Sequence, residues 1–382
     1  MKTTGQSTDV IVIGGGLGGA AISWSLSRRG ARVLLLESGS LAGGTSGACA
    51  GRVQVAESEP GEYLHLVLEG YRRLSELSRE LDADLEWETP GHLTLAQTPQ
   101  EWQHQAGVVE TLRKAGASAE MLDEIALRAA EPLLRPGFAC GASLTQEAHV
   151  NPFKVCLAFA RAAARLGAQI HTHEAVTRFT VEAGGVRVVT RNAEYESGCA
   201  VVAAGAWSGQ VLKLAGSSLP MRHTHAEAMV SEPLPPCLKH HVGMSGFYRA
   251  VHGGEQTVTL GLGQHRSGTL VISNAILQTD LLEQDSTAWA LPALCQALTG
   301  AFPALSAARI VRSWSAPSPF LPDGMPAVGW LPGSTRLFVA AGFHLALPTI
   351  AALCDPAAEA ILSARQLPAR WPFQPGRFIE AA

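Results

Sequence analysis

The sequence predicts an α/β fold in which a parallel sheet covered by helices is accompanied by a separate antiparallel sheet. Three observations predict it. A short apolar run at 10–13 is followed by a glycine-rich turn, a helical segment and a second apolar run at 33–36. The order of strand, glycine and helix returns at 336–364. Between these segments, residues 221–272 contain short runs typical of antiparallel strands.

The N-terminal unit, residues 9–37, carries G-x-G-x-x-G at the turn between its first strand and its helix. Gly14 permits the tight turn, Gly16 lets a pyrophosphate approach the backbone, and Gly19 permits close helix–strand packing. The helix N-terminus offers free N–H groups and a positive dipole end to phosphates. Glu37 ends the second strand, where a carboxylate accepts ribose hydroxyls and disfavours the 2′-phosphate of NADP. This unit predicts a dinucleotide site rather than a purely structural glycine turn.

Composition excludes several other classes of protein. The chain has 382 residues, 47% hydrophobic and 16% charged, which fits one large or two smaller globular domains rather than a disordered chain. The net charge of −4 gives no basic face for nucleic acid or anionic membrane. We expect no membrane span, because no run approaches about 20 apolar residues. The seven cysteines are scattered and form no C-x-x-C pair, which predicts reduced thiols in a cytoplasmic protein.

A second glycine-rich segment, residues 38–52, follows the strand that ends in Glu37. It is too rich in glycine and small residues to form a long regular element. It is therefore either a second cradle for a phosphate or a flat ring, or a flexible surface loop. Its place directly after the acid-bearing strand favours the cradle.

The next part of the chain alternates helical and strand patterns. Asn151 and Pro152 are suited to the N-cap and first position of a helix. His171 and His173 share one strand face, and because two ligands rarely make a metal site we expect no metal centre. We expect helices at 63–81, 99–115, 119–130 and 153–166, and strands at 91–95, 137–144, 169–173, 186–190 (the edge of a meander) and 199–207.

Residues 208–300 are the least regular part of the chain. We expect antiparallel strands of a separate sheet at 221–230, 257–262 and 268–272. The histidines gathered here are interpreted as scattered surface residues rather than a functional group: His223, His225, His240, His241, His252 and His265. Further along we expect a helix at 281–302 broken by Pro292, a loop at 317–332, a buried strand at 336–342 and a closing helix at 349–364.

Taken together, these motifs resemble the D-amino acid oxidase/glycine oxidase/sarcosine oxidase (DAO) family of flavoproteins over nearly the whole chain. The markers are the segments 10–19, 43–48, 147–152, 201–207, 264–268, Trp314 with 322–326, 340–344 and 372–378. The resemblance implies a Rossmann-like FAD-binding domain interleaved with an antiparallel-sheet substrate domain. The FAD-binding domain would comprise 1–85, 145–215 and 325–382, and the substrate domain 86–144 and 216–324.

The resemblance also implies which residues hold the FAD. The expected contacts are Gly14, Gly16, Leu17 and Gly19, Glu37 and Ser38 at the ribose, Gly43, Gly44, Thr45 and Ser46 at the pyrophosphate and ring, Val176 at the adenine, Ala204, Gly205 and Trp207, and Gly342, Phe343, His344 and Leu345 at the pyrimidine end. Backbone donors or a positive charge at that end would stabilise the anionic reduced flavin. The flavin should be non-covalent, because the stretch where some relatives carry a linking cysteine, 315–321, has none.

Departures from the family narrow the expected function. Glycine oxidase-like members bind the substrate carboxylate with an arginine, and the matching positions 317–319 here are Pro-Ser-Pro. A tyrosine expected shortly before Ser267 is also missing. Chains without the arginine that keep Pro-Asp-Gly-x-Pro resemble β subunits of heteromeric sarcosine oxidase, proline or hydroxyproline dehydrogenase and opine oxidase. Where sarcosine oxidase β chains have Gly-Phe-Lys, this chain has Gly-Phe-His at 342–344, and the charge of His344 would depend on pH.

The resemblance thus implies oxidation of an amine to an imine by hydride transfer to flavin N5, in the β subunit of a heteromer. The amine would be a secondary amine or an amino acid such as sarcosine, proline, hydroxyproline or an opine. Partner α or γ subunits would carry a second flavin, such as an FMN at an interface, or an iron–sulfur centre. The alternatives are a stand-alone glycine or D-amino acid oxidase-like enzyme that uses O₂ and a non-catalytic flavoprotein subunit. His344 is the expected catalytic residue, with His265, Arg249 and Tyr248 as substrate-side candidates that would otherwise be ordinary sheet surface.

Overall fold

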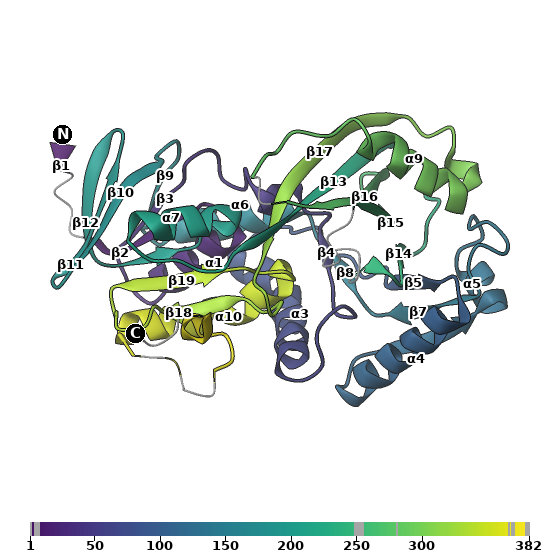
Figure 1. The fold of residues 1–382 in the computed structure, drawn as a ribbon, viewed down its shortest axis with the longest axis horizontal. Coiled ribbons are helices and arrows are strands. Elements are labelled where there is room, and N and C mark those ends of the chain that lie inside the picture. The colour runs from purple at the N-terminus through teal and green to yellow at the C-terminus, as the bar shows by residue number, and fades with distance from the viewer. Residues whose placement is uncertain are drawn as a thin grey trace.

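Two large sheets lie side by side in the molecule, with helices packed on each (Figure 1). The structure is a computed structural model that describes residues 2–3, 8–247, 256–279, 282–365, 367 and 371–378. A short pair of strands, β4 (Arg52–Val53) and β8 (Ala148–His149), forms a third, two-stranded sheet. The chain alternates between the two large sheets: it begins in the first, crosses to the second, returns to the first, crosses to the second again and ends in the first.

The first sheet, sheet A, has a parallel centre and antiparallel additions. In the centre, β12 pairs in parallel with β2 and β19, β2 pairs with β3, and β3 pairs with β9. The antiparallel strands β10, β11 and β18 extend it. Its strands are β1 (Lys2–Thr3), β2 (Thr8–Ile13), β3 (Val33–Leu36), β9 (Gln169–His171), β10 (Val176–Glu182), β11 (Gly185–Thr190), β12 (Ala193–Val202), β18 (Ala327–Trp330) and β19 (Leu337–Ala341).

Four helices pack around the parallel strands: α1 (Leu17–Ser27), α3 (Glu62–Leu81), α6 (Pro152–Arg165) and α10 (Ala346–Ser363). At the start of α6 the Asn151 side chain accepts the Lys154 N–H, so the predicted N-cap is confirmed. Of the described helices, α10 alone is long and apolar enough to cross a membrane, and 67% of it is buried inside the protein. Because α10 packs against α1 and α3, its apolar composition suits a core helix and is weak evidence for a span.

The second sheet, sheet C, is antiparallel except where β14 runs parallel to β5. Its order is β17-β13-β16-β15-β14-β5-β7-β6. The strands are β5 (His92–Ala96), β6 (Ala119–Asp123), β7 (Gly141–Thr145), β13 (Arg222–Pro233), β14 (His241–Met244), β15 (Thr257–Gln264), β16 (Thr269–Gln278) and β17 (Ile310–Phe320). Helices α4 (Pro99–Lys114), α5 (Glu124–Ala130) and α9 (Ala290–Ala301) cover it. The assignment of these sheets to the exact domain ranges expected from the sequence stays a prediction.

Hydrogen bonds from side chains to backbone join the two sheets. Thr45 Oγ1 donates to the Pro317 carbonyl at 2.6 Å, and Trp314 Nε1 donates to the Ala48 carbonyl at 2.8 Å. Both bonds connect α2 (Thr45–Ala48) to β17. The glycine-rich segment after β3 is therefore held against the second sheet.

Several expectations about individual elements were wrong. The helix expected at 119–130 is strand β6 followed by α5, because β6 pairs with β7 and the Asp123 side chain caps the later helix start. The helix expected at 281–302 begins only at Ala290, and Pro292 lies in its first turn, where a missing N–H costs little. The loop expected at 317–332 contains the end of β17 and all of β18. The strand expected at an edge is β11, which lies between β10 and β12.

The packing of α3 on α10 gives a testable prediction. A Cβ at Gly70 would lie 1.8 Å from the Pro348 carbonyl oxygen, so Gly70→Ala must push two buried helices apart. We expect the free energy of unfolding to fall by about 1–3 kcal/mol. The control is Gly107→Ala in α4, where an added Cβ meets nothing within 4 Å and should stabilise the helix. Urea unfolding would measure both, and equal stability of the two variants would contradict this packing.

Candidate functional site

One large cavity, of about 890 Å³, is lined by residues of both sheets. From sheet A the lining takes the carboxyl ends of β2, β3, β12 and β19, which is where open parallel sheets bind ligands. From sheet C it takes residues of β13, β16 and β17. The cavity therefore joins a nucleotide-type binding edge to a wall made by the second sheet.

The first glycine turn is packed against its neighbours too closely for side chains. Gly14 has φ +113°, and a Cβ there would lie 2.4 Å from the Ala203 carbonyl oxygen. A Cβ at Gly19 would lie 1.9 Å from the Gly14 carbonyl oxygen. Gly14 lines the cavity and Gly19 does not, so Gly19 serves the packing of α1 on the turn. The α1 N-cap, Gly16, leaves the helix N-terminus without a capping side chain from its own cap residue.

The residue at the end of β3 is held by the two glycine segments. Glu37 Oε2 accepts the Gly15 N–H at 2.6 Å, and Oε1 accepts the Gly39 N–H at 2.7 Å. Oε1 also accepts the Ser38 hydroxyl at 3.2 Å, whereas Oε2 can accept a second hydrogen bond, so Glu37 retains the capacity to bind a ribose hydroxyl. Its position in the cavity lining suits that task.

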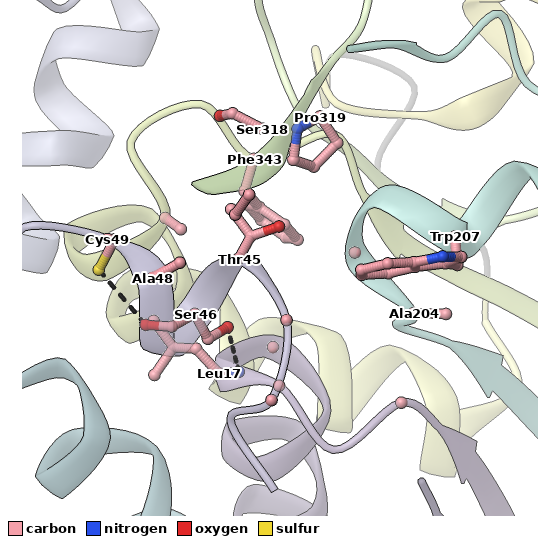
Figure 2. Close-up of a pocket in the computed structure, with 18 of the residues that line it drawn as sticks. Leu17, Thr45, Ser46, Ala48, Cys49, Ala204, Trp207, Ser318, Pro319 and Phe343 are labelled. Carbon is pink, nitrogen blue, oxygen red and sulfur yellow. Dashed lines mark hydrogen bonds between the residues drawn. The ribbon is translucent and has the colours of Figure 1, made fainter. Parts of the chain in front are cut away.

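The segment after Glu37 forms the short helix α2 and closes over the N-terminus of α1. Ser46 Oγ accepts the Leu17 N–H at 2.9 Å. A Cβ at Gly44 would lie 2.9 Å from the Trp207 ring, so the segment can approach that ring only as glycine. Figure 2 shows Thr45, Phe343 and Trp207 around the same opening as Ser318 and Pro319.

The expected cofactor residues all line this cavity, except Gly19. The narrow glycine cradle, the glycine N-cap of α1 and the carboxylate at the end of β3 are the features that a dinucleotide flavin requires, so the residues present fit FAD. Which of them contact FAD stays a prediction.

Other lining residues were missed by the sequence analysis. Helix α7 (Ser208–Leu214) contributes Gln210, Val211 and Leu214, and its only signal was a short apolar spacing after the strand at 199–207. Arg52 and Asn274 also line the cavity. Arg52 ends the segment 38–52 that the sequence predicts as a cradle, but it was not named there as a binding residue, and Asn274 stands in no recognisable motif. Both reach the cavity through strand pairing in the folded chain.

The expected catalytic residues are dispersed. His344 lines the cavity between β19 and α10. His265 is not among the lining residues, and its ring packs on that of His149 with centroids 3.9 Å apart. Tyr248 and Arg249 lie outside the described residues. The structure therefore brings only His344 of the four to the cavity within the part of the chain that it describes.

His265 belongs to a cluster of four imidazoles with His92, His149 and His241. Burial, the largest cause, lowers the pKa of His149 to about 3 and that of His265 to about 4. Burial followed by nearby positive charge, including Arg52, lowers the pKa values of His92 and His241 well below the ordinary value. All four rings are therefore neutral near pH 7. The interpretation of this region's histidines as surface residues was wrong for His223, His225 and His241, which are buried.

Beside this cluster lies a buried charged group. Arg52 Nη2 lies 3.0 Å from Glu147 Oε2, and Glu147 Oε1 accepts the backbone N–H groups of Val55 and Ala56. Glu57 is 3.8 Å from the Arg52 guanidinium, and burial raises the pKa of its carboxyl to about 7 although Arg52 opposes the shift. The Arg52 charge is thus already balanced from within the protein.

The described residues contain no cluster of histidine, cysteine, aspartate or glutamate that could hold a metal ion. The thiols of all seven cysteines are free.

Comparison with known proteins gives a consistent result. The model of the family "DAO: FAD dependent oxidoreductase" matches residues 9–360. A glycine oxidase of Bacillus licheniformis is 28% identical over 342 residues, which cover 87% of each chain. The glycine oxidase structure from Geobacillus kaustophilus has a TM-score of 0.87 at 23% identity and covers 98% of this chain and 99% of its own. The L-proline dehydrogenase structure from P. horikoshii has a TM-score of 0.86 at 22% identity and covers 98% of both. The expected mixed α/β fold is thereby confirmed.

The histidine cluster predicts how stability depends on pH. The unfolded chain binds protons at histidines below about pH 6.5, whereas the folded cluster does not until about pH 3 to 4, at His149 and His265. The cluster's contribution is therefore complete above about pH 6.5 and is lost as pH falls through that window. Each such histidine should make the free energy of unfolding fall by about 1.4 kcal/mol per pH unit.

Urea unfolding between pH 4.5 and 7.5 would measure this slope. His149→Asn removes one titrating group and should make the slope shallower, even if it also lowers stability at every pH. The control His65→Asn changes an exposed histidine of α3 and should leave the slope unchanged. The same slope in wild type and His149→Asn would contradict the assignment.

Proposed function

This chain belongs to the DAO family of FAD-dependent oxidoreductases, and we propose that it oxidises an amine as the β subunit of a heteromeric dehydrogenase or oxidase. Its class is that of FAD-dependent oxidoreductases of amines or amino acids, with CH–NH groups as donors. The proposed donor is a secondary amine or an amino acid. The free thiols support a cytoplasmic location.

FAD, when bound, supplies an acceptor at N5 for the hydride of the carbon that carries the amine. The chain's own residues would bind the cofactor and orient it. The start of α1 would offer to the pyrophosphate the N–H groups that follow Leu17, whose own N–H is bonded to Ser46, and Glu37 would offer a carboxylate oxygen to the ribose. Residues 342–345 lead into the N-terminus of α10, which has no capping side chain, so its N–H groups and dipole favour negative charge there.

The observation that supports the heteromer proposal is the identity of the β17 residues that line the cavity opposite the glycine-rich segment 43–46. Ser318 and Pro319 of β17 line the cavity where glycine oxidase-like chains would place an arginine. Partner subunits with a second redox centre would then accept the electrons. An FMN at an interface receives no support from the compared proteins, and the proposal does not depend on it.

A stand-alone oxidase that uses O₂ is the second candidate. The relative of Bacillus licheniformis is a glycine oxidase, and the match with it spans 87% of both chains. The two candidates share the amine oxidation and differ in the electron acceptor. Reoxidation of the reduced chain separates them.

Under anaerobic conditions, one member of a panel of amines should reduce the flavin of the purified, FAD-loaded chain and so bleach its absorbance. If the chain is a β subunit, air should reoxidise it slowly, while an artificial electron acceptor should do so at least about tenfold faster. Fast reoxidation in air would favour the stand-alone oxidase. A chain that binds FAD but is bleached by no amine would contradict the proposed oxidation.

Glu37 gives a prediction about cofactor binding that needs no turnover. Glu37→Gln keeps the side-chain length but loses the charge and one acceptor, so charge-assisted bonds to Gly15, Gly39 and the ribose are weakened. The Kd for FAD should rise roughly 10- to 100-fold. Titration of apoprotein by flavin fluorescence measures it, with the exposed Glu69→Gln of α3 as control. An unchanged Kd in Glu37→Gln would remove Glu37 from the site.

A further inference from the structure

The wall that sheet C gives to the cavity is built mainly from small, uncharged side chains. We define this sheet C wall as the cavity-lining residues of β13, β16 and β17. Its small apolar members include Ala226, Ala228 and Ala316, and Ala226 pairs directly with Ala316 across the two strands. Its polar uncharged members include Ser273, Asn274 and Ser318.

The charges around this wall oppose a substrate carboxylate. Among the described residues, the wall contains no arginine or lysine, and its one acidic side chain is that of Glu227, which is buried and accepts the Thr287 N–H. Arg52 is the sole arginine in the described cavity lining, and it is paired with Glu147. Moving a carboxylate from water to such a wall is unfavourable without a cation to pair with it, because the lost hydration of the charge is not replaced.

Asn274 is the extra residue of a β-bulge in this wall. β13 pairs Ala228 with Ser273 and Glu227 with Ala275, so Asn274 is left out of the pairing. On its other side, β15 pairs Gly261 with Ser273 and likewise skips Asn274. The backbone of Asn274 has φ +79°, a left-handed conformation that costs energy for a residue with a side chain. Bulges of this kind redirect side chains next to binding sites.

The neighbouring strand leaves room for this arrangement. A Cβ at Gly261 would lie 2.5 Å from Asn274 Nδ2 and 2.6 Å from Ser273 Oγ. Glycine at 261 therefore accommodates both polar side chains where they lie.

The Asn274 amide is available to a ligand. It lines the cavity, is only partly buried, and makes no hydrogen bond to any residue that the structure describes. An asparagine side chain carries two N–H donors and a carbonyl acceptor. A neutral carbonyl or carboxamide can use these groups without bringing a charge into the wall.

We propose that Asn274 determines substrate specificity by hydrogen bonding a neutral polar substituent of the amine. The substrate class would then be an amine that carries a carboxamide, ester or ketone group rather than a free carboxylate. This inference rests on the proposed amine oxidation and narrows its substrate. It assigns Asn274 the role of binding the substituent and gives it no part in the redox step.

The test compares two ethers in which oxygen replaces the amine nitrogen, so that neither is oxidised. Methoxyacetamide carries the neutral group and methoxyacetate the charged one. Isothermal titration calorimetry with the FAD-loaded full chain should show methoxyacetamide binding at least about tenfold more tightly. Equal or tighter binding of methoxyacetate, or no binding of either ether, would overturn the proposal.

Two variants assign the effect to the side chain. Asn274→Gly removes the amide and suits the left-handed backbone, and it should weaken methoxyacetamide binding about tenfold while leaving methoxyacetate unchanged. Asn274→Asp keeps the shape but removes the N–H donors and should also lose the preference. The Kd for FAD should stay the same in both variants, which shows that the cavity is intact. Unchanged methoxyacetamide binding in Asn274→Gly would contradict the role of Asn274.

Anaerobic reduction separates this inference from the function on which it rests. Sarcosine and its amide, sarcosinamide, share the same methylamino group and differ only in carrying a carboxylate or a carboxamide. Reduction of the flavin by sarcosine but not by its amide would support amine oxidation and overturn the inference. Tight binding of methoxyacetamide with no reduction by any amine would overturn the proposed oxidation and leave the assignment of Asn274 standing.

Discussion

The close contact between the first glycine turn and its surroundings is the constraint on which the rest of the structure depends. Gly14 and Gly19 leave no room for a Cβ against Ala203 and each other, so α1 begins directly above the carboxyl ends of β2 and β12. An ordinary side chain at either position would push α1 away from the sheet. The places of the helix start, of the Glu37 carboxylate and of the cavity floor all depend on that contact.

The second constraint is the connection between helix α2, which follows the glycine-rich segment after β3, and strand β17 of sheet C. Thr45 of α2 donates to the backbone of β17 and Trp314 of β17 donates to the backbone of α2, so the spacing between α2 and β17 is set by polar contacts. Because the cavity-lining residues of β13 and β17 are mostly small, the space between α2 and the sheet C wall stays open. A rigid frame with a small-residue wall is a suitable arrangement for chemistry that depends on the positioning of a substrate beside a cofactor.

The distribution of charge divides the cavity into two parts. The sheet A side offers helix N-termini, which suit phosphate and a reduced flavin, whereas the sheet C wall offers neutral groups and one acid. The arginine of the lining and the neighbouring histidines are balanced or neutral, so they add little net field to the substrate side. Within the described residues, this division suits negative charge on a bound cofactor, and it is the charge pattern on which the proposed neutral substituent of the substrate rests.

The sequence by itself predicted which residues line the cofactor half of the cavity. Gly14, Gly16 and Glu37 belong to a local strand–turn–helix pattern, and the segments 43–46 and 342–345 follow from the family resemblance; all of them line the cavity, and their contacts with FAD stay a prediction. Only the tertiary structure decided the substrate half. The positions of Asn274, Arg52 and the histidine cluster depend on pairing between strands far apart in the chain, and a bulge that skips one residue leaves no mark in the local sequence. For the same reason 119–123 formed a strand despite its helical pattern, since pairing with β7 outweighed local preference.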